Sequence, residues 1–444
     1  MSEAYDVARS ALIAIDLQND FLAEGGACPR RHADPALLAQ SIGWLARAAR
    51  DQGRVVVWVT SAYGELAGGD DALRGQSHVG PPCCARGTWG AEPFAALGPA
   101  RAEGAGRADE WHVEKRWHSP FRETDLDARL RARGVTKVVL CGVATNVCLL
   151  AAARDAARLG YAVEVLADAS AASTASRHLR GLGEAEAVGA RVRRWGELLD
   201  EGAGPVRLRG VGSGGSALWC GALREAAPGD AFAAIEREVA WGSMSHRGGE
   251  VPRLVAVQGA RSPDGAEPLY RHPVDEQPAL ADFTPAVDAV RREVERRVGH
   301  PLNHCLLQLY RDGRDWISEH SDKTLDVARP STIVNVSFGR LRTMALKPKA
   351  GGVAQRLPLP PGSFLVMDLA TNADYYHSIR QEGSEGGPRI SLTFRHIGTF
   401  WHPPSGAVWG VGAPAPGRAE AEARARARAA LDPEERARAE RAEA

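Results

Sequence analysis

The chain has 444 residues, a length that predicts two or three domains rather than a single core. Hydrophobic residues make up 44% and charged residues 25% of it, as is typical of a globular protein. Lys plus Arg and Asp plus Glu each number 55, so no overall charge favours nucleic acid or an anionic membrane. No apolar run approaches the roughly 20 residues of a membrane span, and we expect no membrane association.

The number and spacing of the cysteines indicate the redox state of the cellular compartment. Seven cysteines form an odd set without the spacing of a disulfide framework, which favours a reduced, cytoplasmic setting, with a nuclear one also open.

Residues 10–200 alternate short apolar runs with segments of helical periodicity. Near-continuous β-branched runs are typical of strands buried on both faces of a parallel sheet. The runs that predict strands are residues 11–16, 54–60, 137–142 and 161–167. The segments that predict helices are residues 34–51, 125–133 and 146–159, with Asp34, Asp125 and Asn146 as N-caps. This alternation predicts an α/β domain of three layers.

The pattern changes after residues 202–217, a Gly-rich stretch that predicts a linker. Short segments of alternating polarity dominate from about 304 to 400, after one helical segment at 285–298. Such segments favour a β-sandwich or a jelly-roll, and with the helix they predict an α+β domain. The Ala/Arg/Glu-rich end predicts a solvated helix or a disordered tail. The expected organisation is a first domain at 1–201, the linker, a second domain at 218–404 and a tail at 405–444.

Three residues of the first half could form a nucleophilic site. Cys148 is expected in the first turn of a helix, where unpaired N–H groups and the helix dipole can lower a thiol pKa. Asp16 ends the first predicted strand and Lys115 follows a middle one, so both lie at the same sheet edge. A carboxylate that takes the thiol proton, beside a cation, is a suitable activating pair. A lone cysteine at this position is also compatible with simple packing.

The motifs around these residues resemble the isochorismatase-like cysteine hydrolases, which include nicotinamidases and ureido-compound amidohydrolases. They cover about residues 10–195 and read ALIAIDLQNDF, CCARGTWGAE, VEKRWHSPFRETDLDARLRARG and VVLCGVATNVC. The resemblance implies Asp16 as general base, Lys115 as its electrostatic partner and Cys148 as nucleophile. It also implies a cis peptide at Val143–Ala144 and self-association into a homo-oligomer.

One departure from this family concerns metal. Nicotinamidases carry a metal-binding Asp-x-His after the second strand, where this chain reads VTSAYGE. We therefore expect no metal in this half and a substrate other than nicotinamide. The other cysteines of this half, Cys28, Cys83, Cys84 and Cys141, are expected to be structural or incidental.

The second half offers a set of metal ligands. His320 and Asp322 are two residues apart, a spacing that places both side chains on one face of a strand. His377 could supply a third ligand from another strand. Two histidines and one carboxylate bind Fe(II) on one face and leave positions for a co-substrate and oxygen.

The last predicted strand, RISLTFR at 389–395, places Arg389 and Arg395 on one face and apolar residues on the other. Buried arginines need anionic partners, and a dicarboxylate co-substrate fits this requirement. Upstream, Gln308 and Tyr310 share a face and could add hydrogen bonds.

These segments resemble the AlkB-like 2-oxoglutarate/Fe(II) dioxygenases from about Trp241 to Ile397, through QLYRDG, HSD, IVNVSFGRLRTM, LPPGSFLVMD, YYHSI and RISLTFR. The resemblance implies iron at His320, Asp322 and His377. It implies 2-oxoglutarate at Tyr310, Arg389 and Arg395, with the distal carboxylate on Arg389, and a related contact from Gln308. Such enzymes use 2-oxoglutarate and O₂ to hydroxylate a C–H bond, and on an N-methyl group this leads to demethylation.

The sequence leaves three readings open. The first is a bifunctional enzyme that hydrolyses a small amide or ureido compound and carries out an oxygenase reaction. The second is a dioxygenase that repairs methylated nucleobases in nucleic acid, with a hydrolase-like half that only stabilises or dimerises the chain. The third is an interaction protein in which both sets of residues are idle. For the oxygenase, a small-molecule and a nucleic-acid substrate both stay open.

Overall fold

The computed structural model describes residues 9–30, 34–62, 83–97, 101, 103–199, 206–223, 230–246, 249–271, 275–276, 278–382 and 387–429. They belong to two compact units. The first contains the residues up to Leu208 together with Val353–Pro358, and the second contains Arg209–Gly352 and the residues from Leu359 on. No helix within these residues is long and apolar enough to cross a membrane.

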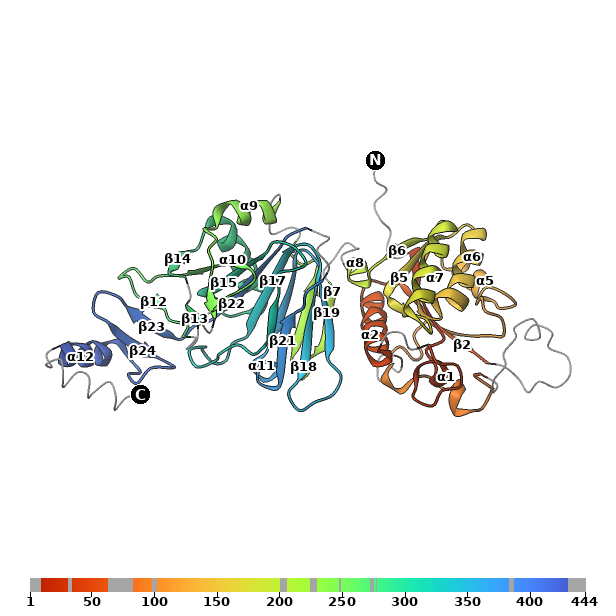
Figure 1. The fold of residues 1–444 in the computed structure, drawn as a ribbon, viewed down its shortest axis with the longest axis horizontal. Helices are drawn as coiled ribbons and strands as arrows, with labels where there is room; N and C mark the ends of the chain where they lie inside the picture. Colours follow the sequence, from red (N-terminus) through yellow and green to blue (C-terminus); the bar gives the residue numbers. More distant parts are fainter. Residues whose placement is uncertain are drawn as a thin grey trace. The chain divides into compact units, whose positions relative to one another are not determined.

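The sheet of the first unit has six parallel strands in the order β3–β2–β1–β4–β5–β6 (Figure 1). The strands are β1 (Ser10–Ile15), β2 (Val55–Ser61), β3 (Glu110–Lys115), β4 (Lys137–Val143), β5 (Ala162–Ala171) and β6 (Arg191–Arg193). Every residue of β1 and β4 is buried, because their apolar side chains meet helices on both faces. This confirms the predicted α/β architecture with a parallel sheet.

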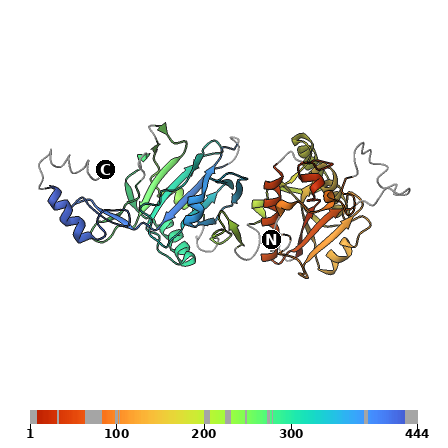
Figure 2. The same ribbon diagram turned by 90° about the horizontal axis from the view of Figure 1, so that it is seen from below.

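Helices cover the two faces of this sheet (Figures 1 and 2). Helix α2 (Pro35–Asp51) packs on one face, and Asp34 caps it by accepting hydrogen bonds from the N–H groups of Ala36 and Leu37. On the other face, α5 (Leu126–Ala132), α6 (Leu150–Arg158) and α7 (Ala175–Ala187) bury their apolar sides against the strands. The short helices are α1 (Asn19–Leu22), η2 (Trp89–Ala91), η3 (Ala95–Leu97) and α8 (Trp195–Leu198).

The helix that carries Cys148 begins differently from the prediction. Its first turn, η4 (Thr145–Leu149), has the wider π geometry, and Ala144 rather than Asn146 is its N-cap residue. The reason is that β4 continues to Val143 and the chain turns directly after it. The Val143–Ala144 peptide is cis, as the family resemblance implied. Asp125 does precede α5, but its side chain makes no capping hydrogen bond.

Two antiparallel sheets form the body of the second unit, which confirms the predicted jelly-roll (Figures 1 and 2). The larger sheet has the order β14–β11–β15–β22–β17–β20–β8–β7 and the smaller β16–β21–β18–β19. The larger sheet consists of β7 (Val206–Val211), β8 (Ser216–Cys220), β11 (Leu254–Gly259), β14 (Leu280–Asp282), β15 (His304–Tyr310), β17 (Ile333–Gly339), β20 (Ser363–Met367) and β22 (Arg389–Arg395). The smaller sheet consists of β16 (Ile317–His320), β18 (Arg342–Pro348), β19 (Gln355–Leu359) and β21 (Tyr375–Ile379).

Strand β22 lies near the centre of the larger sheet, between β15 and β17. Its apolar residues join a core with helices α9 (Ala231–Glu238) and α10 (Pro285–Val298). The opposite face of β22 therefore carries Arg389 and Arg395, as the alternation in the sequence predicted. Helix α11 (Leu369–Asp374) leads into β21.

The predicted linker and tail differ from the structure. Residues 206–211, placed in the linker as part of the Gly-rich stretch 202–217, form β7, because Leu208 and Val211 are buried in the sheet. Residues 407–410, placed in the tail, form a strand in a small sheet, and α12 (Arg418–Ala429) is the expected helix. That sheet contains β12 (Glu267–Pro268), β23 (Thr399–His402) and β24 (Ala407–Gly410); a second contains β9 (Ser245–His246), β10 (Gly249–Glu250) and β13 (Asp275–Glu276). Residues 430–444 lie outside the described part.

Candidate active sites

The three residues predicted for the first half meet at the carboxyl edge of the parallel sheet. Asp16 directly follows β1, Lys115 is the last residue of β3, and Cys148 lies in η4. The ammonium of Lys115 is 2.8 Å from Asp16 Oδ2 and 3.5 Å from Cys148 Sγ. All three side chains are buried, since Asp16 is 0%, Lys115 1% and Cys148 5% exposed. A cation thus lies within hydrogen-bond reach of both a carboxylate and a thiol.

The structure adds residues that the sequence reading missed. Ser61, at the end of β2, donates a hydrogen bond to Asp16 Oδ1 at 3.0 Å and accepts one from Lys115 at 2.8 Å. The amide of Gln18 holds the Ser61 backbone through both its N–H and its C=O, each at 2.8 Å. His118 Nδ1 lies 3.7 Å from Cys148 Sγ. These contacts join residues 30 to 54 positions apart, so only the strand order brings them together.

The electrostatics of Cys148 differ from the expectation of a lowered pKa. Burial raises the pKa of this thiol to about 12, while the charge of Lys115 acts in the opposite direction. The helix start therefore does not by itself produce a thiolate. With this raised pKa the sulfur keeps its proton near neutral pH, so a nucleophilic role of Cys148 would need a base beside it. The Asp16 carboxylate belongs to the same group of side chains, because Lys115 contacts both Asp16 and Cys148.

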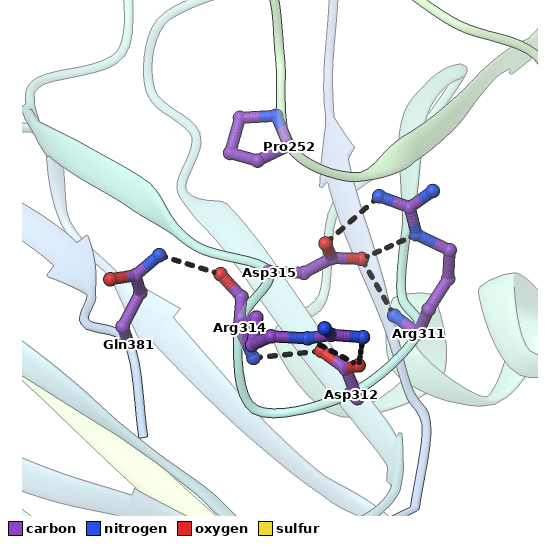
Figure 3. A pocket seen from close by; sticks show the side chains of 6 residues that line it. All are labelled: Pro252, Arg311, Asp312, Arg314, Asp315 and Gln381. Carbon is purple, nitrogen blue, oxygen red and sulfur yellow. Dashed lines mark hydrogen bonds and ion pairs between the residues drawn. The ribbon is translucent and has the colours of Figure 1, made fainter. Parts of the chain in front are cut away.

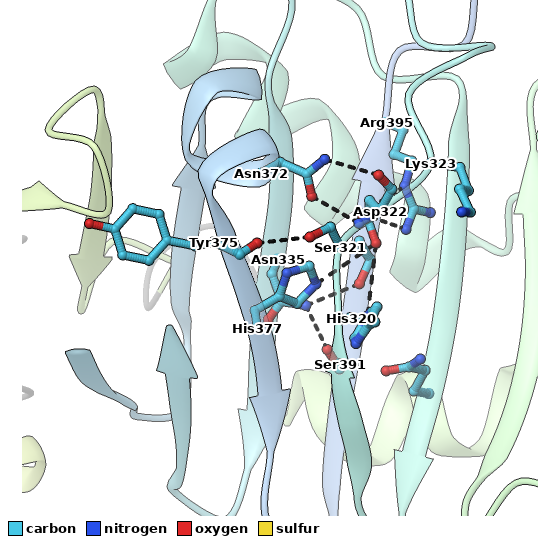
Figure 4. Close-up of polar contacts among 12 residues, drawn as sticks. His320, Ser321, Asp322, Lys323, Asn335, Asn372, Tyr375, His377, Ser391 and Arg395 are labelled. Atoms are coloured by element: carbon cyan, nitrogen blue, oxygen red, sulfur yellow. Dashed lines mark hydrogen bonds and ion pairs between the residues drawn. The ribbon is translucent and has the colours of Figure 1, made fainter. Parts of the chain in front are cut away.

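In the second unit, His320, Asp322 and His377 converge between β16 and β21 (Figure 4). His320 and His377 are directly opposite across the β16–β21 pair, and their ring centroids are 4.2 Å apart. The two Nε2 atoms lie 4.0 and 3.8 Å from Asp322 Oδ1. One ligand atom from each residue lies within 4.8 Å of the others, close enough to share one metal ion. The set fits Fe(II), because two imidazoles and a carboxylate on one face suit this metal.

The protonation states favour metal binding. Burial lowers the pKa of His377 to about 3, so its imidazole is neutral and free to donate an electron pair. Burial acts to raise the pKa of Asp322, but its surroundings, above all the charge of Arg395, outweigh burial and lower this pKa to about 2. His320 Nδ1 is 2.8 Å from the carbonyl of Ser318, which leaves Nε2 available for a metal.

The two arginines of β22 have different environments. The guanidinium of Arg395 donates to Asp322 Oδ2 at 2.8 and 3.2 Å, so it pairs with the metal ligand. Arg389 is 1% exposed and donates to Ser337 Oγ at 2.8 Å. Within the described part of the chain, its Nε and Nη1 have no hydrogen-bond partner. Burial lowers the pKa of Arg389 to about 10, and the group still carries its charge near neutral pH. An anion beside Arg389 would use these two donors.

Tyr310 and Gln308 lie next to this arginine. The ring of Tyr310 is 5.1 Å from the Arg389 guanidinium, and its hydroxyl donates to Gln308 Oε1 at 2.9 Å. The structure therefore brings the seven residues predicted for this half into two groups. One contains the three metal ligands and Arg395, and the other contains Arg389, Tyr310 and Gln308. Arg395 is the one whose main contact differs from the implied role, because it binds Asp322.

Comparisons with known proteins agree with this geometry. Residues 10–197 match the isochorismatase domain, and residues 217–395 match the 2OG-Fe(II) oxygenase superfamily. The chain joins an isochorismatase-like hydrolase domain to an AlkB-like dioxygenase domain. Both families indicate enzyme activities.

Individual relatives divide in the same way. The oxygenase domain is 33% identical over 134 residues to human alpha-ketoglutarate-dependent dioxygenase alkB homolog 3, covering 28% of this chain and 46% of that protein. It is 36% identical to human DNA oxidative demethylase ALKBH2, covering 26% and 47%. The chain thus spans about half the length of these curated relatives. The isochorismatase-like domain is 29% identical to an Arabidopsis thaliana protein described as a probable inactive nicotinamidase, covering 43% of this chain and 96% of that protein.

A further residue supports the metal ligands of the oxygenase domain. Asn372, in α11, accepts a hydrogen bond from Asp322 N at 2.8 Å and donates one to Asp322 O at 2.9 Å (Figure 4). This double contact fixes the backbone of the carboxylate ligand. Asn372 was not among the predicted residues, although it lies five positions before His377.

The oxygenase domain also has a pocket of about 450 Å³ beside the loop between Tyr310 and His320 (Figure 3). Its lining consists of Pro252, Arg311, Asp312, Arg314, Asp315 and Gln381. Arg311 pairs with Asp315 at 2.9 Å and Arg314 with Asp312 at 2.8 Å. The two arginines and the two aspartates of the lining balance each other, so the pocket has no net charge.

Proposed function

We propose that this chain is a bifunctional enzyme. Its first domain hydrolyses a C–N bond of a small amide or ureido compound through a cysteine nucleophile. Its second domain uses Fe(II), 2-oxoglutarate and O₂ for hydroxylation or oxidative N-demethylation. The observation that carries this proposal is that both sets of reactive groups are complete: Lys115 lies between Asp16 and Cys148, and the two histidines lie around Asp322.

In the hydrolase domain, the proposed reaction starts with proton transfer from the Cys148 thiol to Asp16. The sulfur attacks the carbonyl carbon, the C–N bond breaks, and the amine leaves with the proton that Asp16 held. Water then attacks the thioester while Asp16 accepts a proton, which returns to the sulfur as the acid is released. Lys115, 2.8 Å from Asp16, stabilises the carboxylate and the developing thiolate.

In the oxygenase domain, His320, Asp322 and His377 would hold the iron. When bound, the iron supplies activation of O₂, coupled to conversion of 2-oxoglutarate to succinate. The chain's own residues bind and orient. Arg389 offers two unused donors to a carboxylate of the co-substrate, and Tyr310 lies beside it. Arg395 holds Asp322 in place through Oδ2.

For the oxygenase substrate, two candidates have specific support. A small molecule is supported by the balance of 55 Lys plus Arg against 55 Asp plus Glu, since binding to a nucleic-acid backbone requires an excess of cations. A methylated nucleobase is supported by the relative described as a DNA oxidative demethylase. Under this alternative, the hydrolase-like domain has a structural or oligomerising role.

One experiment separates these possibilities. The purified chain is incubated with panels of amides, ureido compounds, N-methylated metabolites and methylated oligonucleotides, and ammonia and succinate are measured separately. We expect Cys148→Ala to abolish ammonia release and keep succinate formation, and His320→Ala to do the reverse. Ammonia release that survives Cys148→Ala excludes the proposed nucleophile. Substrate-coupled succinate formation that survives His320→Ala excludes the proposed iron site. A chain that demethylates oligonucleotides and releases no ammonia from any compound supports the alternative.

A further inference from the structure

A group of thiols lies outside the proposed catalytic residues of the hydrolase domain. Cys83 and Cys84 are adjacent in the chain, and their sulfur atoms are 3.9 Å apart. One oxygen of Asp20 lies within 4.8 Å of both sulfur atoms. The thiol of Cys28 interacts with that of Cys83. Asp20, Cys83 and Cys84 therefore lie within reach of one ion, with Cys28 next to Cys83, although we expected these cysteines to be structural or incidental.

We propose that Cys28, Cys83, Cys84 and Asp20 form a binding site for a thiophilic metal ion such as Zn²⁺. This set differs from the Asp-x-His whose loss led us to expect no metal in this half, and the proposal replaces that expectation. It does not depend on the function proposed above.

The spacing of the sulfur atoms fits a tetrahedral metal site. Zinc binds thiolates at about 2.3 Å, and a tetrahedral angle then places two bound sulfur atoms about 3.8 Å apart. Cys83 and Cys84 already have this separation, at 3.9 Å. Asp20 is the third donor of this set. The thiol of Cys28, next to Cys83, would be the fourth that a tetrahedral structural zinc site requires.

The chemistry of the donors agrees with a cation at this point. Thiolate and carboxylate groups are ligands that Zn²⁺ takes in proteins, and a bound ion displaces the thiol protons. A Cys28–Cys83 disulfide is the competing use of the same thiols, but it requires an oxidant.

The site would brace the loop beside the catalytic residues. Asp20 Oδ2 accepts a hydrogen bond from Cys84 N at 2.6 Å, and Asp20 Oδ1 accepts one from Ala27 N at 3.0 Å. Two residues before Asp20, Gln18 holds Ser61, which in turn contacts Asp16. A metal bound by Cys28, Cys83 and Cys84 would therefore hold in place the segment that positions Asp16, the proposed general base.

The test is cobalt titration of the full chain, stripped of metal and kept reduced and free of oxygen. His320→Ala/His377→Ala protein is used, so that the oxygenase site does not contribute. We expect one equivalent of Co²⁺ to bind with the near-ultraviolet charge-transfer absorption of thiolate ligands. In the same background, Cys83→Ser and Cys28→Ser should each abolish or strongly weaken this absorption, and both positions are partly exposed, so these variants should fold. Cys148→Ser, which removes a thiol outside the cluster, should keep it.

Three results would overturn the proposal: no thiolate–cobalt absorption, absorption unchanged in Cys83→Ser, or absorption lost in Cys148→Ser. Peptide mapping after exposure to air adds a further outcome. A Cys28–Cys83 disulfide in a chain that takes up no cobalt when reduced would identify a redox pair instead of a metal site.

Discussion

The guanidinium of Arg395 donates two hydrogen bonds to the same oxygen of Asp322, at 2.8 Å from Nη2 and 3.2 Å from Nε. With Oδ2 engaged in this way, Oδ1 lies near the two imidazoles, 3.8 Å from His377 and 4.0 Å from His320. We therefore propose that Arg395 orients this carboxylate for metal binding, whereas the family resemblance implied that Arg395 binds the co-substrate.

This pairing predicts the effect of Arg395→Met on the metal-free protein. The substitution leaves the Asp322 carboxylate, whose side chain is 7% exposed, without its cation. Removing one partner of a buried ion pair costs about 3–5 kcal/mol, so we expect the free energy of unfolding to fall by that amount. Urea denaturation of metal-free protein measures it. The Asp322→Asn/Arg395→Met double variant should recover part of the loss. Equal stability of wild type and Arg395→Met would show that the pair contributes nothing.

A second prediction concerns Arg389, whose Nε and Nη1 are available to a carboxylate. Hydrogen bonds to a charged group contribute about 1.5–3 kcal/mol, so Arg389→Met should raise the KM for 2-oxoglutarate roughly 10- to 150-fold. The kcat at saturating co-substrate should change much less. Succinate formation against 2-oxoglutarate concentration separates the two constants. Arg340→Met, in the turn after β17, serves as the control and should leave KM unchanged. A drop in kcat alone would contradict the binding role.

Residues that follow a local repeat were predictable from the sequence. The alternation in RISLTFR placed Arg389 and Arg395 opposite the apolar residues of β22, and the structure has that arrangement. The apolar runs of the first half predicted a parallel sheet. Strands of such a sheet are buried on both faces, so their sequences lack the alternation of polar and apolar residues seen in half-exposed strands.

Features that depend on long-range pairing were not predictable. Ser61 meets Asp16 only because β2 lies beside β1, and Asn372 meets Asp322 only because α11 leads into the strand that pairs with β16. The Gly-rich composition of residues 202–217 suggested a linker, since local composition does not reveal that residues 206–211 join a sheet as β7. The pKa of the Cys148 thiol is raised because the side chain is buried. The position of Cys148 at a helix start did not indicate this burial.

The two hydrogen bonds between the Asn372 side chain and the backbone of Asp322 give a third prediction. Loss of groups that orient metal ligands typically costs 10- to 100-fold in metal affinity, and we expect a reduction of about this size for Asn372→Ala. Titration of the metal-free protein with Mn²⁺, a substitute for Fe²⁺, measures it. Asn303 offers a matched control, because it makes the same pair of hydrogen bonds to Ile397, at 2.7 and 2.9 Å. Asn303→Ala should lower stability and keep the metal affinity. Equal affinities in both variants would refute the orienting role of Asn372.

The last prediction concerns the pH dependence of Cys148. Burial raises the pKa of this thiol and Lys115 lowers it, so replacing Lys115 by Met should raise it further. An adjacent cation typically shifts a pKa by about 1–3 units, so thiolate-dependent alkylation by iodoacetamide at a fixed pH below the pKa should slow by about 10- to 1000-fold. The rising limb of its pH profile should move to higher pH by the same number of units.

Lys137→Met is the control for that experiment, because Lys137 is also buried and ion-paired, with Glu164 at 2.8 Å, but has no contact with Cys148 among the described residues. Its alkylation profile should match that of the wild type. A Lys115→Met profile that coincides with the wild type, in protein with an unchanged circular dichroism spectrum, would mean that Lys115 does not stabilise the thiolate. In that case the ion pair with Asp16 would have only a structural role.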